Sequence, residues 1–245
     1  MAKSSISARR RLKVLVADTK NLLFYGAHAP FVAQRIFVNP QQISKVYFPN
    51  LWSGELPQKI EPQSAQWGPL LGGRRASGKV IGGDWDRDVI PIEDCPKYQI
   101  CMRHFVDGKS WEESGAYSMM RDVLKSIPNA DGCRTEEDVA ARYRKVDELY
   151  HAIKAEKELK TRKEVQRQAF RESGGVYVHV DRNGDVVFGG GGWHRLVISM
   201  LLGLESIPAQ MGVVHTDAIH SWQKYRRANS KVVERASGRA KGGTA

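Results

Sequence analysis

Hydrophobic and polar positions are most clearly patterned in residues 176–215, and the first part of this stretch predicts a β-hairpin. Tyr177–Val180 and Val186–Phe188 are rich in β-branched and aromatic residues, as strands usually are. Between them, Asn183-Gly184 is a pair typical of a two-residue hairpin turn. The pattern therefore predicts two antiparallel strands joined by a tight turn.

The second part of the stretch predicts a glycine loop, a helix and a third strand. The glycines Gly189, Gly190, Gly191 and Gly192 are followed by apolar residues at helical spacing between Leu196 and Leu204. Gly203 suits the end of that helix, and the chain is extended and apolar again from Ile207. Residues 176–215 thus form a predicted core motif in which a glycine loop leads directly into a helix.

A longer helical pattern begins at Thr135, which can form a capping box with Asp138. Its apolar positions alternate in steps of four and three: Val139, Tyr143, Val146, Tyr150 and Ile153. The polar half that follows predicts a solvated continuation to about Phe170. An earlier helix is predicted to start at Ser110, so that residues 110–172 form a helical insertion.

Shorter extended segments precede the insertion. Arg35–Val38 reads as a strand closed by Asn39-Pro40, and Val46–Phe48 and Lys79–Ile81 extend again. Residues 50–83 between them are rich in proline, glycine and polar residues, which predicts a long surface loop. The alternation of strands and helices predicts an α/β (α+β) fold with one domain over residues 14–221.

The net charge of +11 is concentrated at the two ends of the chain. Residues 1–13 carry +5 and residues 222–245 carry +6, which leaves residues 14–221 formally neutral. Basic tails of this kind bind phosphate backbones without reading sequence, and they also serve as solubilising ends. Binding to DNA is therefore predicted for the tails rather than for the domain.

Three cysteines without C-x-x-C spacing fit a reducing compartment, and no apolar run approaches the length of a transmembrane helix. The N-terminus also lacks the apolar core of a secretory signal. These features predict a soluble cytoplasmic protein that has no membrane partner and needs no disulfides.

The start of the helix after the glycine loop favours an anion. The first amides of a helix have no internal partners and lie at the positive end of its dipole, and glycines let a phosphate approach the backbone. Trp193, His194 and Arg195 follow directly, and the last two add side-chain donors. Gly189–Arg195 is therefore a candidate phosphate loop, although glycine runs also serve as plain connectors.

The core motif resembles the ParB/sulfiredoxin superfamily. The resemblance rests on Phe188, the glycines, His194-Arg195-Leu196, Leu202-Gly203-Leu204 and Ile207-Pro208-Ala209. It implies a mixed sheet in which the loop binds the phosphates of a nucleotide such as ATP, ADP or CTP. Asn39-Pro40 followed by Ile43 is similar to the entry of ParB-like domains.

Two departures from the superfamily pattern narrow what the resemblance implies. Trp193 stands where a sulfiredoxin has its catalytic cysteine, which argues against sulfiredoxin chemistry. Partition proteins carry two arginines in the loop and a helix-turn-helix domain after it, whereas this chain has His194-Arg195 and little sequence beyond.

A second candidate site follows the predicted strand at Lys79–Ile81. Asp84 and Asp86 are two residues apart, so both carboxylates can lie on one side of an extended backbone. There they could hold Mg²⁺ or accept a proton, which would complement a phosphate loop if the two stretches meet. Aspartates also cap loops by bonding their own backbone.

These features predict a nucleotide-dependent phosphotransferase or hydrolase. In this hypothesis Gly189–Arg195 hold the phosphates, and Asp84, Asp86 and His194 are the candidate catalytic residues. Two other classes stay open: a DNA-binding or nuclease-like protein that uses its basic tails, and a non-catalytic interaction protein that uses its long helix.

Overall fold

The computed structural model describes residues 8–47, 71 and 73–227, which are organised around one mixed sheet. The strands run in the order β1-β7-β5-β6-β2-β4, and β3 pairs with β7 off this path. Their bounds are Arg35–Val38 (β1), Lys45–Tyr47 (β2), Val80–Ile81 (β3), Val89–Pro91 (β4), Val176–Val180 (β5), Val186–Phe188 (β6) and Ile207–His215 (β7). Because β5 and β3 run parallel to β7 while β1 runs antiparallel to it, the sheet is mixed. The predicted α/β (α+β) class is confirmed.

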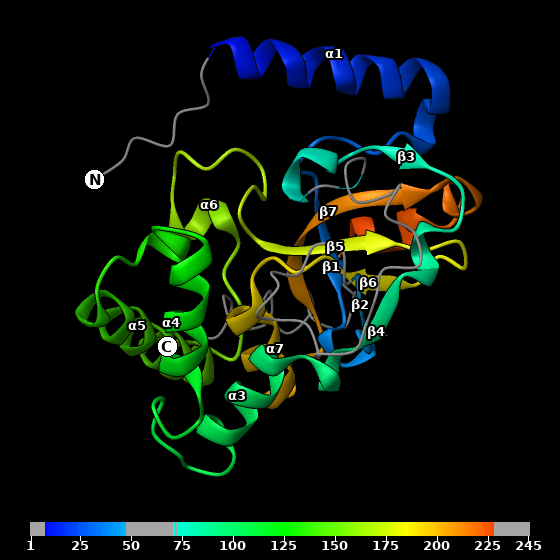
Figure 1. Cartoon of the computed structure of the whole chain (residues 1–245). Coiled ribbons are helices and arrows are strands. Elements are labelled where there is room, and N and C mark those ends of the chain that lie inside the picture. Colours follow the sequence, from blue (N-terminus) through cyan, green and yellow to red (C-terminus); the bar gives the residue numbers. More distant parts are fainter. Residues whose placement is uncertain (1–7, 48–70, 72, 228–245) are drawn as a thin grey trace, which may run out of the picture.

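Helices pack against one another and against the sheet (Figure 1). Their bounds are Ala8–Tyr25 (α1), Pro96–Phe105 (α3), Ala116–Ser126 (α4), Glu136–Glu156 (α5), Arg162–Val165 (α6) and Trp193–Leu201 (α7). Helix α7 packs on β5, and both α3 and α5 pack on α7. The helical insertion is thereby brought against the core motif.

The core motif has the predicted order of elements. The β5–β6 hairpin pairs Val178 with Phe188 and Val180 with Val186, and Gly184 in its turn has a φ of +79°. The nine residues of β7 are all buried. This strand lies between β1 and β5, which explains why Ile207–His215 is apolar on both faces.

The helices differ from the sequence prediction in three ways. Helix α5 ends at Glu156, where Lys157 takes the left-handed conformation with a φ of +56°, and the short α6 starts a new capping box at Thr161. The helix predicted from Ser110 begins only at Ala116, because Gly115 takes the left-handed conformation, with a φ of +90°, and interrupts the turn that Ser110 and Glu113 cap. Helix α3, which begins at Pro96, was not predicted.

Both basic ends are shorter than predicted. Ala8 to Lys13 lie within helix α1, although residues 1–13 were predicted as a tail. At the other end Trp222 is fully buried and donates its indole N–H to the carbonyl of His28 at 2.9 Å. The segment Trp222–Arg226 is a 3₁₀ helix and belongs to the folded body. The rest of the tails and the loop over 50–70 lie outside the described residues.

Thr135→Ala is expected to lower the free energy of unfolding by about 1 kcal/mol, the usual cost of losing a helix N-cap. The Thr135 hydroxyl accepts from the amide of Asp138 at 3.2 Å, and the Asp138 carboxylate accepts from the amide of Thr135 at 3.2 Å. Urea unfolding measures the loss. Thr135→Ser keeps the hydroxyl and should stay within about 0.5 kcal/mol of the wild type; an equal loss in both variants would contradict the assignment.

Candidate functional site: a basic cavity at the glycine loop

The glycine loop Gly189–Gly192 stays hydrogen-bonded to the start of β5 while it crosses from β6 to α7. The amide of Gly189 donates to the carbonyl of Tyr177 at 2.8 Å, and the amide of Tyr177 donates to the carbonyl of Gly191 at 2.7 Å. The loop therefore has a fixed path at the edge of the hairpin, and helix α7 begins at a defined position.

Three of the loop glycines, Gly189, Gly191 and Gly192, lie too close to other parts of the chain to carry a Cβ without displacement. A Cβ on Gly191 would lie 2.6 Å from Nη2 of Arg74, so a side chain there would displace that arginine. Gly192 has a φ of +91°, and its Cβ would lie 3.0 Å from the Cα of Val176. The glycines thus let Arg74 and β5 approach the loop, a structural role that holds with or without a ligand.

A cavity of about 480 Å³ opens between this loop and helix α5. Five cationic side chains line it, against a single carboxylate, that of Asp131. The cations are Arg74, Lys97, Arg142, Lys145 and Arg195, and Gly190, Gly191, Gly192 and His194 also line the cavity. The site is therefore strongly positive although residues 14–221 as a whole are neutral.

Arg74 and Arg195 are held beside the loop by backbone carbonyls. Nη2 of Arg74 donates to the carbonyl of Gly175 at 2.7 Å, and Nη2 of Arg195 donates to the carbonyl of Gly174 at 2.9 Å. Burial, followed by repulsion from Arg162 and Arg74, lowers the pKa of Arg195 to about 10. Arg195 is still charged at neutral pH, but it lies among like charges that the described residues only partly neutralise.

Neither the N-cap nor the first turn of α7 supplies a side chain that compensates the positive end of the helix. Gly192 is its N-cap and offers no side-chain acceptor, and the first turn contains no acidic residue. The indole N–H of Trp193, a residue that is 4% exposed, also has no partner among the described residues. Free amides and excess cations at one helix start favour an anion there.

His194 is neutral in this environment. Burial lowers the pKa of His194 to about 3, and the nearby charges of Arg142, Lys97 and Arg195 act in the same direction. Its ring makes edge contacts with Tyr143 and Trp111, at centroid distances of 5.7 and 6.3 Å. His194 therefore lines the cavity as a neutral donor or acceptor rather than as a cation, and such a low pKa makes it a weak base.

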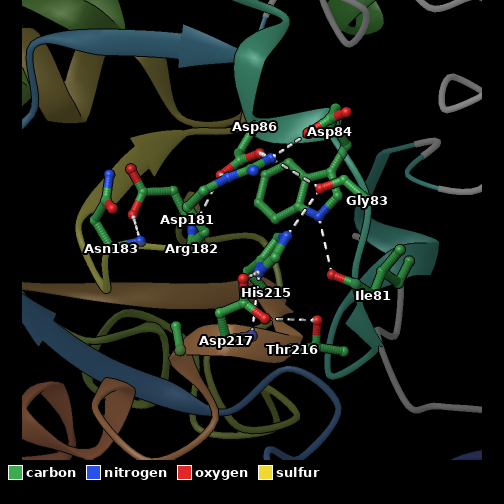
Figure 2. Close-up of polar contacts among 12 residues, drawn as sticks. Ile81, Gly83, Asp84, Asp86, Asp181, Arg182, Asn183, His215, Thr216 and Asp217 are labelled. Carbon is green, nitrogen blue, oxygen red and sulfur yellow. Dashed lines mark hydrogen bonds and ion pairs between the residues drawn. The ribbon is translucent and has the colours of Figure 1, made fainter.

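Asp84 and Asp86 are engaged by Arg182, in the turn of the β5–β6 hairpin (Figure 2). Asp86 Oδ1 lies 2.6 Å from Nη2 of Arg182, and Asp86 Oδ2 accepts from Nε and from the backbone amide at 2.8 and 3.1 Å. Asp84 Oδ1 lies 2.8 Å from the same Nη2. Burial opposes the ionisation of Asp86, but these hydrogen bonds outweigh burial and hold the pKa of Asp86 below its usual value.

The structure does not bring these aspartates to the glycine loop. The loop contacts Tyr177 at the start of β5, whereas Arg182 follows the end of that strand, roughly 15 Å away at about 3.3 Å per residue. The rings of Trp85, His179 and Tyr177 lie between the two places, with centroids 5.6 and 5.0 Å apart in turn. Asp84 and Asp86 therefore do not line the cavity at the glycine loop, and the condition for a joint site is not met.

Sequence reasoning missed the cations that the helices contribute to the cavity. Lys97 comes from α3, and Arg142 and Lys145 come from α5, where they flank the buried stripe residue Val146. In the sequence, the only indication of these cations is that basic residues stand beside the apolar positions of the helix. A helix face that is simply solvated has the same pattern. Arg74, from the segment predicted as a long surface loop, also lines the cavity with the glycine loop.

The neutral state of His194 makes the protein sensitive to acid. Its pKa of about 3 in the fold is below 6.5, so the unfolded chain takes up a proton first as the pH falls. The stabilising contribution is complete above about pH 6.5 and is lost progressively toward pH 3. Urea unfolding of the wild type and His194→Gln between pH 7.5 and 4.5 should give a shallower pH dependence for the variant; equal slopes would contradict a neutral His194.

No protein family, curated protein or solved structure matches the chain. Among the described residues, no helix is long and apolar enough to cross a membrane, and no group of three or more histidines, cysteines or acids could hold a metal ion. What is established is a mixed α/β domain with a basic cavity at a glycine loop. The superfamily resemblance remains a prediction.

Proposed function

We propose that the protein binds a nucleotide through its phosphates in the glycine-loop cavity, and that it uses the nucleotide in phosphoryl transfer or hydrolysis. The observation that carries the proposal is the concentration of Arg74, Arg142 and Arg195 with two lysines around the uncapped start of α7, where Asp131 in the cavity and Glu172 near Arg195 offset only part of the positive charge. A phosphate chain would supply the missing negative charge, and it would accept from the first amides of the helix.

The cluster keeps an excess of positive charge, because the two nearby carboxylates, Asp131 and Glu172, are fewer than its five cations. Arg142 pairs with Asp131 at 2.5 Å, but its buried Nε has no partner among the described residues. Arg74 and Arg195 are bound to neutral carbonyls and a neutral amide oxygen, which orient the guanidinium groups without cancelling their charge. Preorganised cations of this kind bind phosphates without a reorganisation cost.

The catalytic part of the proposal depends on the groups that line the cavity. Asp131 and the neutral His194 are the side chains there that can accept a proton, whereas Asp84 and Asp86 are bound to Arg182 elsewhere. The two aspartates do not fit as ligands for a metal at the phosphates. We therefore derive no step through a metal; Mg²⁺ is expected only as an ion that the nucleotide carries with it.

Isothermal titration with ATP, ADP, CTP and GTP, each with and without Mg²⁺, tests the proposal. Binding of at least one nucleotide is expected, with affinity that falls as salt rises because the contacts are ionic. No heat with any nucleotide would overturn the proposal. The glycine loop would then serve internal packing alone, and the protein would belong to the non-catalytic or DNA-binding classes.

A further inference from the structure

Helix α1 presents large apolar side chains to solvent. Six of them are between 52% and 81% exposed: Leu12, Leu15, Val16, Leu22, Leu23 and Phe24. At about 100° per residue, all of these except Phe24 fall within one arc of roughly 120° along the helix. Soluble monomers rarely expose a contiguous apolar surface of this kind without a partner.

Polar contacts outside the apolar arc of α1 fix this orientation. The carboxylate of Asp18 lies 2.7 Å from Nη2 of Arg171 and accepts from the amide of Val32 at 2.8 Å. Nδ2 of Asn21 donates to the carbonyls of Pro30 and Gly78 at 2.7 and 2.6 Å. The polar side of the helix is thus anchored to the body, and its apolar side points outward.

Over the described residues most of the apolar side is open, and Leu15, at the edge of the arc, is 62% exposed but also lines a cavity against Gln168–Arg171. Figure 1 shows α1 lying outside the sheet and the other helices, joined to the body near its C-terminal end. The apolar side can therefore meet a flat surface along most of its length.

The charges on α1 decide what kind of surface it fits. Arg9, Arg10, Arg11, Lys13 and Lys20 are cationic, and Asp18, the single acid of the helix, is buried in its pair with Arg171. A second copy docked on this face would bring cations against cations with no acid to pair them. An anionic phospholipid surface complements both properties, because leucines insert at the acyl boundary and the basic residues meet the headgroups.

We propose that α1 is an interfacial helix that lies in the plane of an anionic phospholipid membrane and holds the domain at its surface. This proposal departs from the sequence prediction of no membrane partner, which rested on the lack of a transmembrane run, because the helix binds the membrane laterally and does not cross it. The proposal is independent of the nucleotide site, whose cavity is formed by other elements.

Flotation of the full-length protein with vesicles tests the proposal. Binding is expected to vesicles of phosphatidylcholine with about 30% phosphatidylglycerol and to be at least about tenfold weaker with pure phosphatidylcholine. The double variant Leu15→Asn, Leu23→Asn keeps the charge of the protein and should bind the anionic vesicles at least about tenfold more weakly, because it removes two inserted side chains.

Val165→Asn is the matched control, since Val165 is also 62% exposed but lies on α6. It should bind the anionic vesicles like the wild type. Equal binding by the wild type and the α1 variant would overturn the proposal and assign the affinity to basic residues alone. Absence of vesicle binding would also overturn it, and light scattering that shows a dimer lost in the α1 variant would assign the face to a second copy.

Discussion

Gly192→Ala is expected to lower the free energy of unfolding by about 2–4 kcal/mol, combining backbone strain with a steric overlap. Gly192 has a φ of +91°, a conformation that alanine adopts only with strain, and an added Cβ would meet Val176 and Gly175 backbone atoms at 3.0–3.3 Å. Neither neighbour can move easily, because both belong to the backbone that leads into β5. Urea unfolding measures the loss.

Gly203→Ala provides the control at the other end of the same helix. Gly203 also has a positive φ, of +65°, but a Cβ there would meet no atom within 4 Å. In this variant the free energy of unfolding should fall by only about 1 kcal/mol, because only backbone strain is added. An equal loss at both positions would mean that the close approach of Gly192 to β5 contributes nothing to stability.

Lys145→Glu is expected to weaken nucleotide binding by about 10- to 100-fold, the range for losing a charged contact and placing a like charge beside the phosphates. Lys145 is exposed on α5, and it lines the cavity opposite the glycine loop. Because the residue is at the surface, the substitution should leave the fold intact. Isothermal titration with the best-binding nucleotide measures the effect.

The matched control is Arg144→Glu, which makes the same change of charge on the same helix. Arg144 is exposed and does not line the cavity. The affinity of this variant for the nucleotide should stay within about threefold of that of the wild type, because an exposed charge outside the site is screened by salt. An equal loss of nucleotide affinity in both variants would mean that the nucleotide is attracted by the overall positive charge and makes no contact with Lys145 in the cavity.

The fold could be predicted where local patterns and tertiary packing agree. The β-branched and aromatic residues with the Asn183-Gly184 turn predicted the β5–β6 hairpin, and the Thr135 capping box predicted the start of α5. The end of α5 could not be predicted, because Lys157 takes a left-handed conformation that its sequence does not favour. The helix predicted from Ser110 is interrupted for a related reason: Ser110 and Glu113 cap a turn as predicted, but Gly115 then takes the left-handed conformation, which the sequence does not require.

The site was predicted only as far as it is local in sequence. The glycine loop and the start of α7 are contiguous, so spacing could identify them. Arg142 and Lys145 reach the loop because α5 packs on α7, a contact between residues about 50 positions apart that no pattern encodes. Asp84 and Asp86 were chosen for their chemistry, but the sequence does not show that Arg182 binds both of them.

The backbone amides of the glycine loop give the most direct test of whether nucleotide phosphates bind in the cavity. In a two-dimensional NMR titration of the labelled protein with ATP, the account predicts the largest shifts at Gly190–Arg195, with smaller ones near Lys145. Shifts confined to helix α1 or to the basic ends would contradict the account, as would a spectrum that does not change at saturating ATP.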